Sequence, residues 1–119
     1  MLVDVHAHVI PGSFPLAPTG CDPAAWPSMA AASDGARLLV SGALRFTARQ
    51  AWFDAERRLA ASAASGVDAE VVSPFPPLLN YLLPAAHGRD LARWVNEYIA
   101  GLCAAAPGRI YGLGTVPSP

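Results

Sequence analysis

The chain opens with a regular alternation of apolar and polar side chains. Within residues 2–10, Val3, Val5, Ala7 and Val9 alternate with the polar residues Asp4, His6 and His8. A period of two is typical of a β-strand with two different faces. Two short apolar runs, residues 69–75 and 110–116, are bounded by proline and glycine and predict two buried strands.

Between these predicted strands the apolar residues recur at helical spacing. Asp54 is the expected N-cap of a first helix that ends at Ser65-Gly66. A second helix is expected from Asp90, as its cap, to Pro107-Gly108. Its apolar face would consist of Leu91, Trp94, Val95, Tyr98, Ile99 and Leu102.

The order strand, helix, strand, helix, strand predicts an α/β fold with a parallel sheet, because each helix provides the crossover that parallel strands need. We expect the strands over 2–10, 69–75 and 110–116 to be adjacent, with both helices on one side. Residues 13–50 contain four prolines and predict an irregular insertion, with a small hairpin around Ser41-Gly42. Three parallel strands by themselves would leave sheet edges and an apolar face uncovered.

Composition and charge exclude some classes of partner. The 119 residues are 53% hydrophobic and 14% charged, with a net charge of −1. Nucleic acids and anionic membranes require a basic surplus, so neither is an expected partner. The low charge fits either a surface covered by other polypeptide or an alanine-rich composition. Cys21 and Cys103 form no CxxC pair, the N-terminus lacks the features of a signal peptide, and no apolar run approaches a membrane span, so we expect a cytoplasmic protein.

His6 and His8 are the candidate chemical groups. Residues two apart on a strand point to the same face, about 6.6 Å apart along the backbone, so both imidazoles can approach one ion. Zinc accepts histidine nitrogens, and catalytic zinc sites keep one position open for water or substrate. Such a pair also arises by chance on strands. Here it lies at the end of the first strand, after Asp4 and before an Ile-Pro-Gly turn.

The segment Asp4-Val5-His6-Ala7-His8-Val9-Ile10-Pro11 resembles the opening of the amidohydrolase-related proteins typified by aminocarboxymuconate-semialdehyde decarboxylase. Residues 54–73 are similar to that family's first helix and second strand, and Trp94-Val95-Asn96-Glu97-Tyr98 resembles its second helix. Arg109-Ile110-Tyr111-Gly112-Leu113-Gly114-Thr115-Val116-Pro117 closely matches its third strand. The resemblance covers nearly the whole chain. It implies that residues 1–119 are the N-terminal portion, three strands and two helices, of a TIM-type (β/α)8 barrel, which takes about 250 residues when complete.

The resemblance assigns roles to a few residues. His6 and His8 match the family's first two zinc ligands. Arg45 falls near an arginine that grips the substrate carboxylate, with Arg49 as the competing choice and a solvated surface arginine as the alternative for either. The family's third metal-binding histidine, its aspartate ligand and its catalytic histidine lie on later strands, so we expect no catalytic residue within these 119. His87, which precedes the second helix, is a weaker metal candidate.

The implied function is a zinc-dependent, non-oxidative decarboxylase of a small unsaturated or aromatic carboxylic acid, active only as part of the complete barrel. The alternatives are a metal-dependent hydrolase of an ester, lactone or amide, and an inactive truncated fragment. A homo-oligomer of the full-length enzyme is expected. We also expect Leu78, Asn80 and Tyr81 either to wall the substrate site or to pack as ordinary loop residues. Gly112 and Gly114 would admit substrate to the barrel interior or relieve crowding there.

Overall fold

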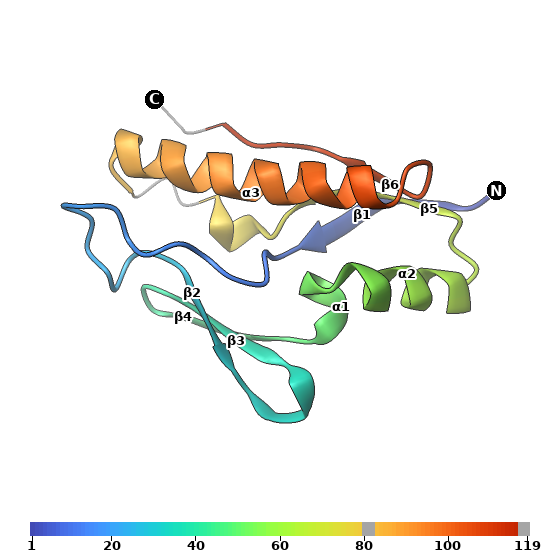
Figure 1. Ribbon diagram of the computed structural model, residues 1–119, viewed down its shortest axis with the longest axis horizontal. Helices are drawn as coiled ribbons and strands as arrows, with labels where there is room; N and C mark the ends of the chain where they lie inside the picture. Colours follow the sequence, from blue (N-terminus) through green and yellow to red (C-terminus); the bar gives the residue numbers. More distant parts are fainter. Residues whose placement is uncertain (80–82, 117–119) are drawn as a thin grey trace.

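A computed structural model describes residues 1–79 and 83–116 of the chain. It contains two sheets and three α-helices, whose arrangement Figure 1 shows. In chain order the elements are β1 (Val3–Val9), β2 (Ser28–Ala31), β3 (Arg37–Ser41), β4 (Leu44–Ala48), α1 (Gln50–Phe53), α2 (Ala55–Ala64), β5 (Ala69–Pro74), α3 (Ala85–Ala105) and β6 (Ile110–Gly112). Single 3-10 turns occupy Ser33–Gly35 and Pro76–Leu78. The predicted mixed α/β class with a parallel sheet is confirmed.

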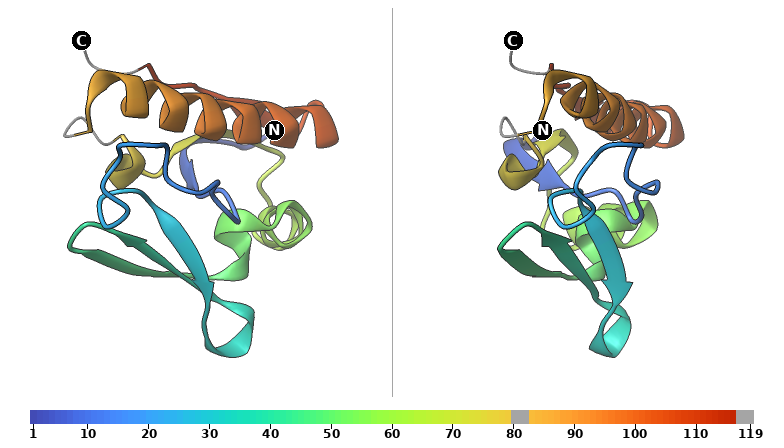
Figure 2. Two further views of the ribbon diagram at one scale, coloured as in Figure 1. Left: turned by 60° about the vertical axis from the view of Figure 1, so that its left-hand side comes forward. Right: turned by 90° about the vertical axis from the view of Figure 1, so that its left-hand side faces the viewer.

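The first sheet is parallel in the order β1-β5-β6, as the alternation of strands and helices predicts. Strand β6 is shorter than predicted, although the amide of Leu113 still donates to the Val72 carbonyl at 2.9 Å. Both long helices lie on one face of this sheet (Figure 2). Arg58 of α2 contacts Glu70, and the α3 residue Ile99 lies against the backbone of Gly112, which is opposite Val72.

A bulge interrupts the pairing of β1 with β5. Asp4 is opposite Glu70, but Ala7 is opposite Val72, so β1 has one residue more than its partner over this stretch. The side chain of Asp4 accepts a hydrogen bond from the His6 amide at 2.9 Å inside the bulge. Bulges re-aim the side chains that follow them, and regular alternation resumes at His6.

The first predicted helix begins where the sequence indicates. The Asp54 side chain accepts a hydrogen bond from the Arg57 amide at 3.2 Å, as an N-cap should. The predicted start of α3 at Asp90 is wrong. The helix begins after Pro84, and the Gly88 amide donates to the Pro84 carbonyl at 2.9 Å. Proline has a fixed φ that suits the start of a helix, and Ala85 and Ala86, which follow it, favour the helical conformation.

The segment predicted to be irregular contains the second sheet. Strands β2, β3 and β4 pair antiparallel in sequence order. The predicted hairpin at Ser41-Gly42 joins β3 to β4, with Ser41 opposite Leu44 and Gly42 at φ +58°. Strand β2 was not expected from the sequence, because Ser28-Met29-Ala30-Ala31 shows no alternation and owes its conformation to pairing with β3.

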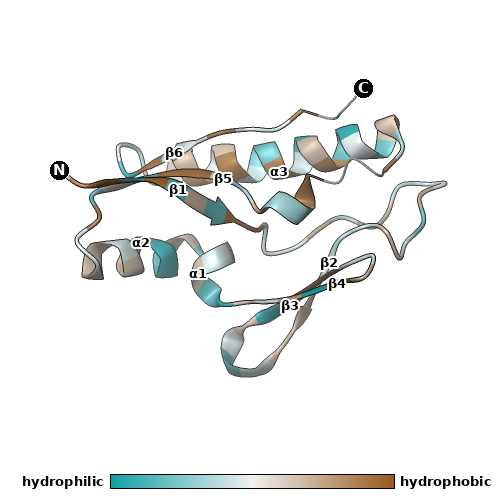
Figure 3. Cartoon of the chain, turned by 180° about the vertical axis from the view of Figure 1, so that it is seen from behind, coloured by the Kyte–Doolittle hydropathy of each residue, from teal (hydrophilic) through white to brown (hydrophobic). Residues whose placement is uncertain are grey.

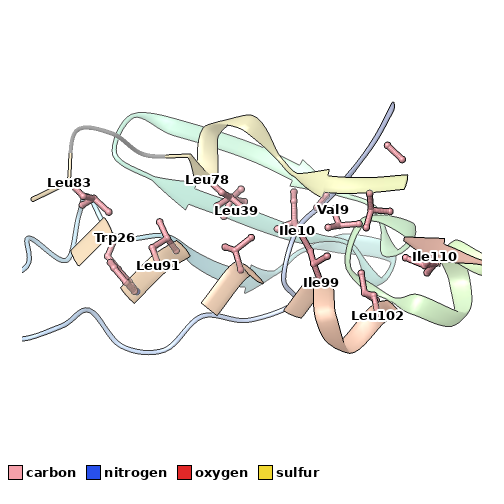
Figure 4. Packing of buried hydrophobic residues seen from close by; sticks show 14 of the residues in the cluster. Val9, Ile10, Trp26, Leu39, Leu78, Leu83, Leu91, Ile99, Leu102 and Ile110 are labelled. Atoms are coloured by element: carbon pink, nitrogen blue, oxygen red, sulfur yellow. The ribbon is translucent and has the colours of Figure 1, made fainter. Parts of the chain in front are cut away.

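The core lies between the parallel sheet, α3 and the second sheet (Figure 4). The strand residues Val9, Val72 and Ile110, with Ile10 just after β1, lie in one core cluster with residues of α3 and with Leu39 of β3. The α3 residues are Leu91, Val95, Ile99 and Leu102. Glu70 is also buried, with an exposed fraction of 6%. Its carboxylate lies 3.2 Å from the Arg58 guanidinium, which also donates to the Ala51 carbonyl. The charge is therefore paired where burial would otherwise be costly. No helix of the described ranges is both long enough and apolar enough to cross a membrane.

Candidate metal and substrate site

His6 and His8 lie on the same face of β1, near its carboxyl end. Their ring centroids are 5.0 Å apart and the ring planes meet at 83°. His8 is half-buried and His6 is exposed, whereas Ala7 between them is buried on the opposite face. In Figure 3 the carboxyl end of β1 is coloured as hydrophilic. The geometry permits both imidazoles to approach one ion; their role as metal ligands stays a prediction.

Ser73 of β5 holds the ring of His8. The Ser73 hydroxyl lies 3.1 Å from Nδ1 of His8 and 3.4 Å from the Ala7 carbonyl. A hydroxyl that donates to the carbonyl accepts from Nδ1–H, which leaves the Nε2 lone pair of His8 free. Metal-binding histidines usually donate their second ring N–H in this way. Sequence reasoning missed Ser73, although a polar residue within the apolar run 69–75 was a signal for it.

Three aromatic rings gather beyond the carboxyl ends of β1 and β5. Phe75 directly follows β5, and its amide donates to the Val9 carbonyl at 3.0 Å. Phe46 from β4 lies 4.6 Å from the Phe75 ring, and Trp52 from α1 lies 5.4 Å from it. All three side chains are only half-buried. The second sheet and α1 thus contribute an aromatic wall at the edge of the sheet where Ser73 and His8 lie.

Arg45 lies on the other face of β4 from Phe46. It is exposed, and its guanidinium donates to the carbonyls of Gly42 and Leu44, both at 2.9 Å. Adjacent strand residues point to opposite faces, so Arg45 faces away from the aromatic wall in this arrangement. Arg49 is also exposed and is the N-cap of α1. The structure does not bring either arginine to the histidine pair, and the substrate-binding role of Arg45 stays a prediction.

The other predicted site residues are His87 and three residues of the loop after β5. His87 lies in the first turn of α3, where its Nδ1 is buried without a hydrogen-bond partner among the described residues. Leu78 is buried in the core at 3% exposure, whereas Asn80 and Tyr81 lie outside the described residues. Across the described ranges, no three metal-ligating side chains cluster in a way that could hold an ion.

Gly112 and Gly114 do not face the histidine side of the sheet. A Cβ atom on Gly112 would overlap Cγ2 of Ile99, and one on Gly114 would lie 3.1 Å from Oδ1 of Asn96. Both glycines therefore face α3. The interpretation that they open the barrel interior is wrong; they allow the helix to approach the sheet.

No family model matches the chain. It is similar to two decarboxylases over 116 residues, which are 97% of its length. Identity is 26% to the 2-amino-3-carboxymuconate-6-semialdehyde decarboxylase of Dictyostelium discoideum and 29% to the enzyme of the same name from Caenorhabditis elegans. These relatives are decarboxylases of the amidohydrolase superfamily. The resemblance noted from the sequence motifs is thus confirmed.

The chain spans about a third of the length of these decarboxylases, 32% and 29% respectively, and corresponds to their N-terminal portion. Its fold is similar to that of Metarhizium anisopliae IDCase in the apo form, with a TM-score of 0.66 and 19% identity. The match covers 98% of this chain and 35% of the IDCase chain. Both sequence and fold therefore match a first third of larger proteins.

Proposed function

We propose that this chain forms the first three strands of a TIM-type barrel in a metal-dependent, non-oxidative decarboxylase. The observation that carries the proposal is the pair His6 and His8, on one face at the carboxyl end of β1, with Nδ1 of His8 held by Ser73. Active sites of such barrels lie at the carboxyl ends of the strands. The names of the two sequence relatives support decarboxylation as the reaction.

The histidine pair fits a divalent metal, zinc by preference. Nε2 of His8 is free to bind, and the exposed His6 ring lies next to it. Two imidazoles supply half of a four-coordinate shell. The resemblance to the decarboxylases implies that a further histidine and an aspartate from later strands would complete it. When bound, the metal would supply Lewis-acid stabilisation of negative charge and a lowered pKa for bound water. The role of Ser73 is to orient the His8 ring.

The proposed substrate is a small unsaturated or aromatic carboxylic acid. Decarboxylation breaks a carbon–carbon bond, releases CO2 and places a proton on the carbon that carried the carboxyl group. The aromatic wall of Phe46, Trp52 and Phe75 offers a planar conjugated molecule an apolar surface beside the histidine pair. Arg45 would have to turn from its present carbonyl partners to anchor a carboxylate. We also propose that the full-length enzyme is a homo-oligomer in the cytoplasm.

The test uses the full-length protein and the variants His6→Ala and His8→Ala. Zinc content is measured by elemental analysis, and CO2 release is measured from 2-amino-3-carboxymuconate 6-semialdehyde and from simple aromatic acids. We expect both variants to lose zinc and to lose turnover by about 100-fold or more, since the metal supplies several kcal/mol of transition-state stabilisation. His87→Ala is the matched control and should retain both.

Two results would count against the proposal in different ways. Full zinc occupancy in both variants would remove the histidine pair from the metal site. Hydrolysis of a lactone or amide without CO2 release from any acid would replace the decarboxylase by the hydrolase of the same superfamily.

A further inference from the structure

A pocket lies on the helix side of the parallel sheet, away from the histidine pair. Its volume is about 430 Å³, which is the size of a small-molecule site. The segment that follows β1, the guanidinium of Arg37, Phe53 of α1 and three residues of α3 line it; the α3 residues are Trp94, Glu97 and Tyr98. The chain after β1 runs beside α3 (Figure 2), and residues from both segments line the pocket.

Hydrogen bonds fix the walls of this pocket in place. The Trp94 indole donates to the Ser13 carbonyl at 2.9 Å, and the Tyr98 hydroxyl donates to the Phe53 carbonyl at 3.0 Å. Burial raises the pKa of Tyr98 to about 12, so its hydroxyl stays a protonated donor at neutral pH. Each bond joins α3 to a different wall, and the pocket is therefore preformed.

Arg37 provides a positioned positive charge. Its guanidinium carbon lies 4.6 Å from the centroid of the Phe53 ring, and one of its nitrogens donates to the Gly12 carbonyl. A Cβ atom at Gly12 would lie 2.9 Å from that nitrogen, so a larger residue there would shift the end of the Arg37 side chain. Stacking and the single carbonyl bond leave the other N–H groups of the fork for a ligand.

Glu97 provides the opposite charge on the same pocket. It is exposed on α3, one helical turn after Trp94, and both residues line the pocket. The ion pair that the described residues contain joins Arg58 to Glu70, and Arg37 and Glu97 do not neutralise each other directly. A positive charge, a negative charge and an aromatic surface thus line one cavity, and the two charges do not form an ion pair with each other.

We propose that this pocket binds an α-amino acid with an aromatic or large apolar side chain. Its carboxylate pairs with Arg37, its ammonium group pairs with Glu97, and its side chain packs against Trp94. A carboxylate and a guanidinium form parallel, charge-assisted hydrogen bonds, which suits the fixed plane of Arg37. The site is separate from the proposed metal site, because Ala7 and Val9 face the helices while His6 and His8 face the other way. It does not depend on the proposed reaction.

Isothermal titration calorimetry on the full-length protein tests the site with three probes. L-Phenylalanine carries both charges, 3-phenylpropionate lacks the ammonium group, and phenethylamine lacks the carboxylate. We expect L-phenylalanine to bind with a Kd of about 1 mM or tighter. Each analogue should bind at least about tenfold more weakly, since one charged hydrogen-bonded pair is lost.

Matched variants assign each charge to its residue. Arg37→Met should weaken the binding of L-phenylalanine at least about tenfold, so that this variant binds L-phenylalanine no more tightly than phenethylamine. Glu97→Gln should bind L-phenylalanine no more tightly than 3-phenylpropionate. Arg57→Met, which removes an exposed arginine of α2, should change nothing. Even if a variant fails to fold, the comparison of L-phenylalanine with its analogues in the unaltered protein tests whether the pocket recognises both charged groups. Absence of L-phenylalanine binding, equal binding of either analogue, or unchanged affinity in Arg37→Met would overturn the proposal.

Discussion

At the scale of single residues, the half-buried His8 depends on a residue 65 positions away in the sequence. The Ser73 hydroxyl lies 3.1 Å from Nδ1 of His8, and where that hydroxyl accepts from Nδ1–H the Nε2 lone pair is free. His6 has its backbone, rather than its ring, held by Asp4. The two candidate ligands are therefore not equivalent: the His8 ring is oriented before a metal binds, whereas the His6 ring is exposed.

Ser73→Ala should weaken zinc binding by about 10-fold to 100-fold, the usual effect of losing a hydrogen bond behind a metal-binding histidine. The measurement is competition with a chelator of known affinity, using the full-length protein. Ser28→Ala removes an exposed hydroxyl at the start of β2 and serves as the control. If Ser73→Ala binds zinc as tightly as the parent, the hydroxyl does not orient the ring.

The raised pKa of Tyr98 leads us to expect that the folded protein loses stability at alkaline pH. Its pKa rises from 10.0 to about 12 in the folded chain, with desolvation by burial as the largest cause. The folded state therefore holds the phenol proton more tightly than the unfolded state. The resulting stabilisation is complete below pH 10 and is lost as the pH rises from 10 to 12.

The variant Tyr98→Phe isolates this effect. It should cost about 1 kcal/mol at neutral pH, because the hydrogen bond to the Phe53 carbonyl is lost. It should also flatten the dependence of unfolding free energy on pH between 10 and 12. Denaturant unfolding at several pH values measures both. A variant with the same alkaline slope as the parent would show that other groups cause the loss.

At the scale of elements, the contact between α3 and β6 depends on two glycines and one amide. Gly112 and Gly114 remove the side chains that would separate helix and strand. Asn96 of α3 then donates to the Thr115 carbonyl and accepts from the Thr115 amide, both at 2.8 Å. One side chain thus satisfies both backbone groups of a residue beyond the end of the strand, as a neighbouring strand would.

Gly112→Ala should destabilise the protein by about 1–3 kcal/mol, because the added Cβ would overlap the buried Ile99 side chain and force α3 outward. Gly101→Ala is the matched control. Gly101 lies in α3 with nothing near its Cα substituent, so alanine should stabilise the helix there by up to about 1 kcal/mol. Denaturant unfolding measures both changes. Equal effects of the two substitutions would mean that α3 does not press on β6.

At the scale of the whole molecule, the histidine side of the parallel sheet is open. Tyr111, opposite Val71, is 54% exposed, and Leu113 beyond it is 57% exposed. The outer edges of β1 and β6 have no strand partner among the described residues. Exposed apolar faces and free strand edges favour association. In the proposed barrel, later strands would cover this face.

Residues 1–119 expressed alone should therefore self-associate in a concentration-dependent manner, which sedimentation velocity would detect. Tyr111→Lys and Leu113→Lys together should reduce the association, because charge on the open face opposes its burial. Leu16→Lys changes a leucine that is 94% exposed but lies outside the sheet, and should have no effect. A stable monomer at all concentrations would contradict the open-face interpretation.

Local sequence patterns by themselves determined the main strand, the two long helices and the parallel sheet of this protein. Alternation over residues 2–10 specified a strand with His6 and His8 on one face, and the helical spacing after Asp54 and along α3 specified two helices. The order of the elements then specified the parallel sheet. These inferences hold because side-chain periodicity and crossover geometry depend on neighbours close in sequence.

The tertiary structure decided what depends on segments that meet from far apart. It placed Ser73 behind His8, turned Gly112 toward α3, directed Arg45 away from the aromatic wall and ordered β2 against β3. It also assembled the pocket between Arg37 and Glu97. No periodicity encodes these contacts, because each is set by the register of strands, the bulge in β1 and the docking of α3, and hence by the packing of the chain as a whole.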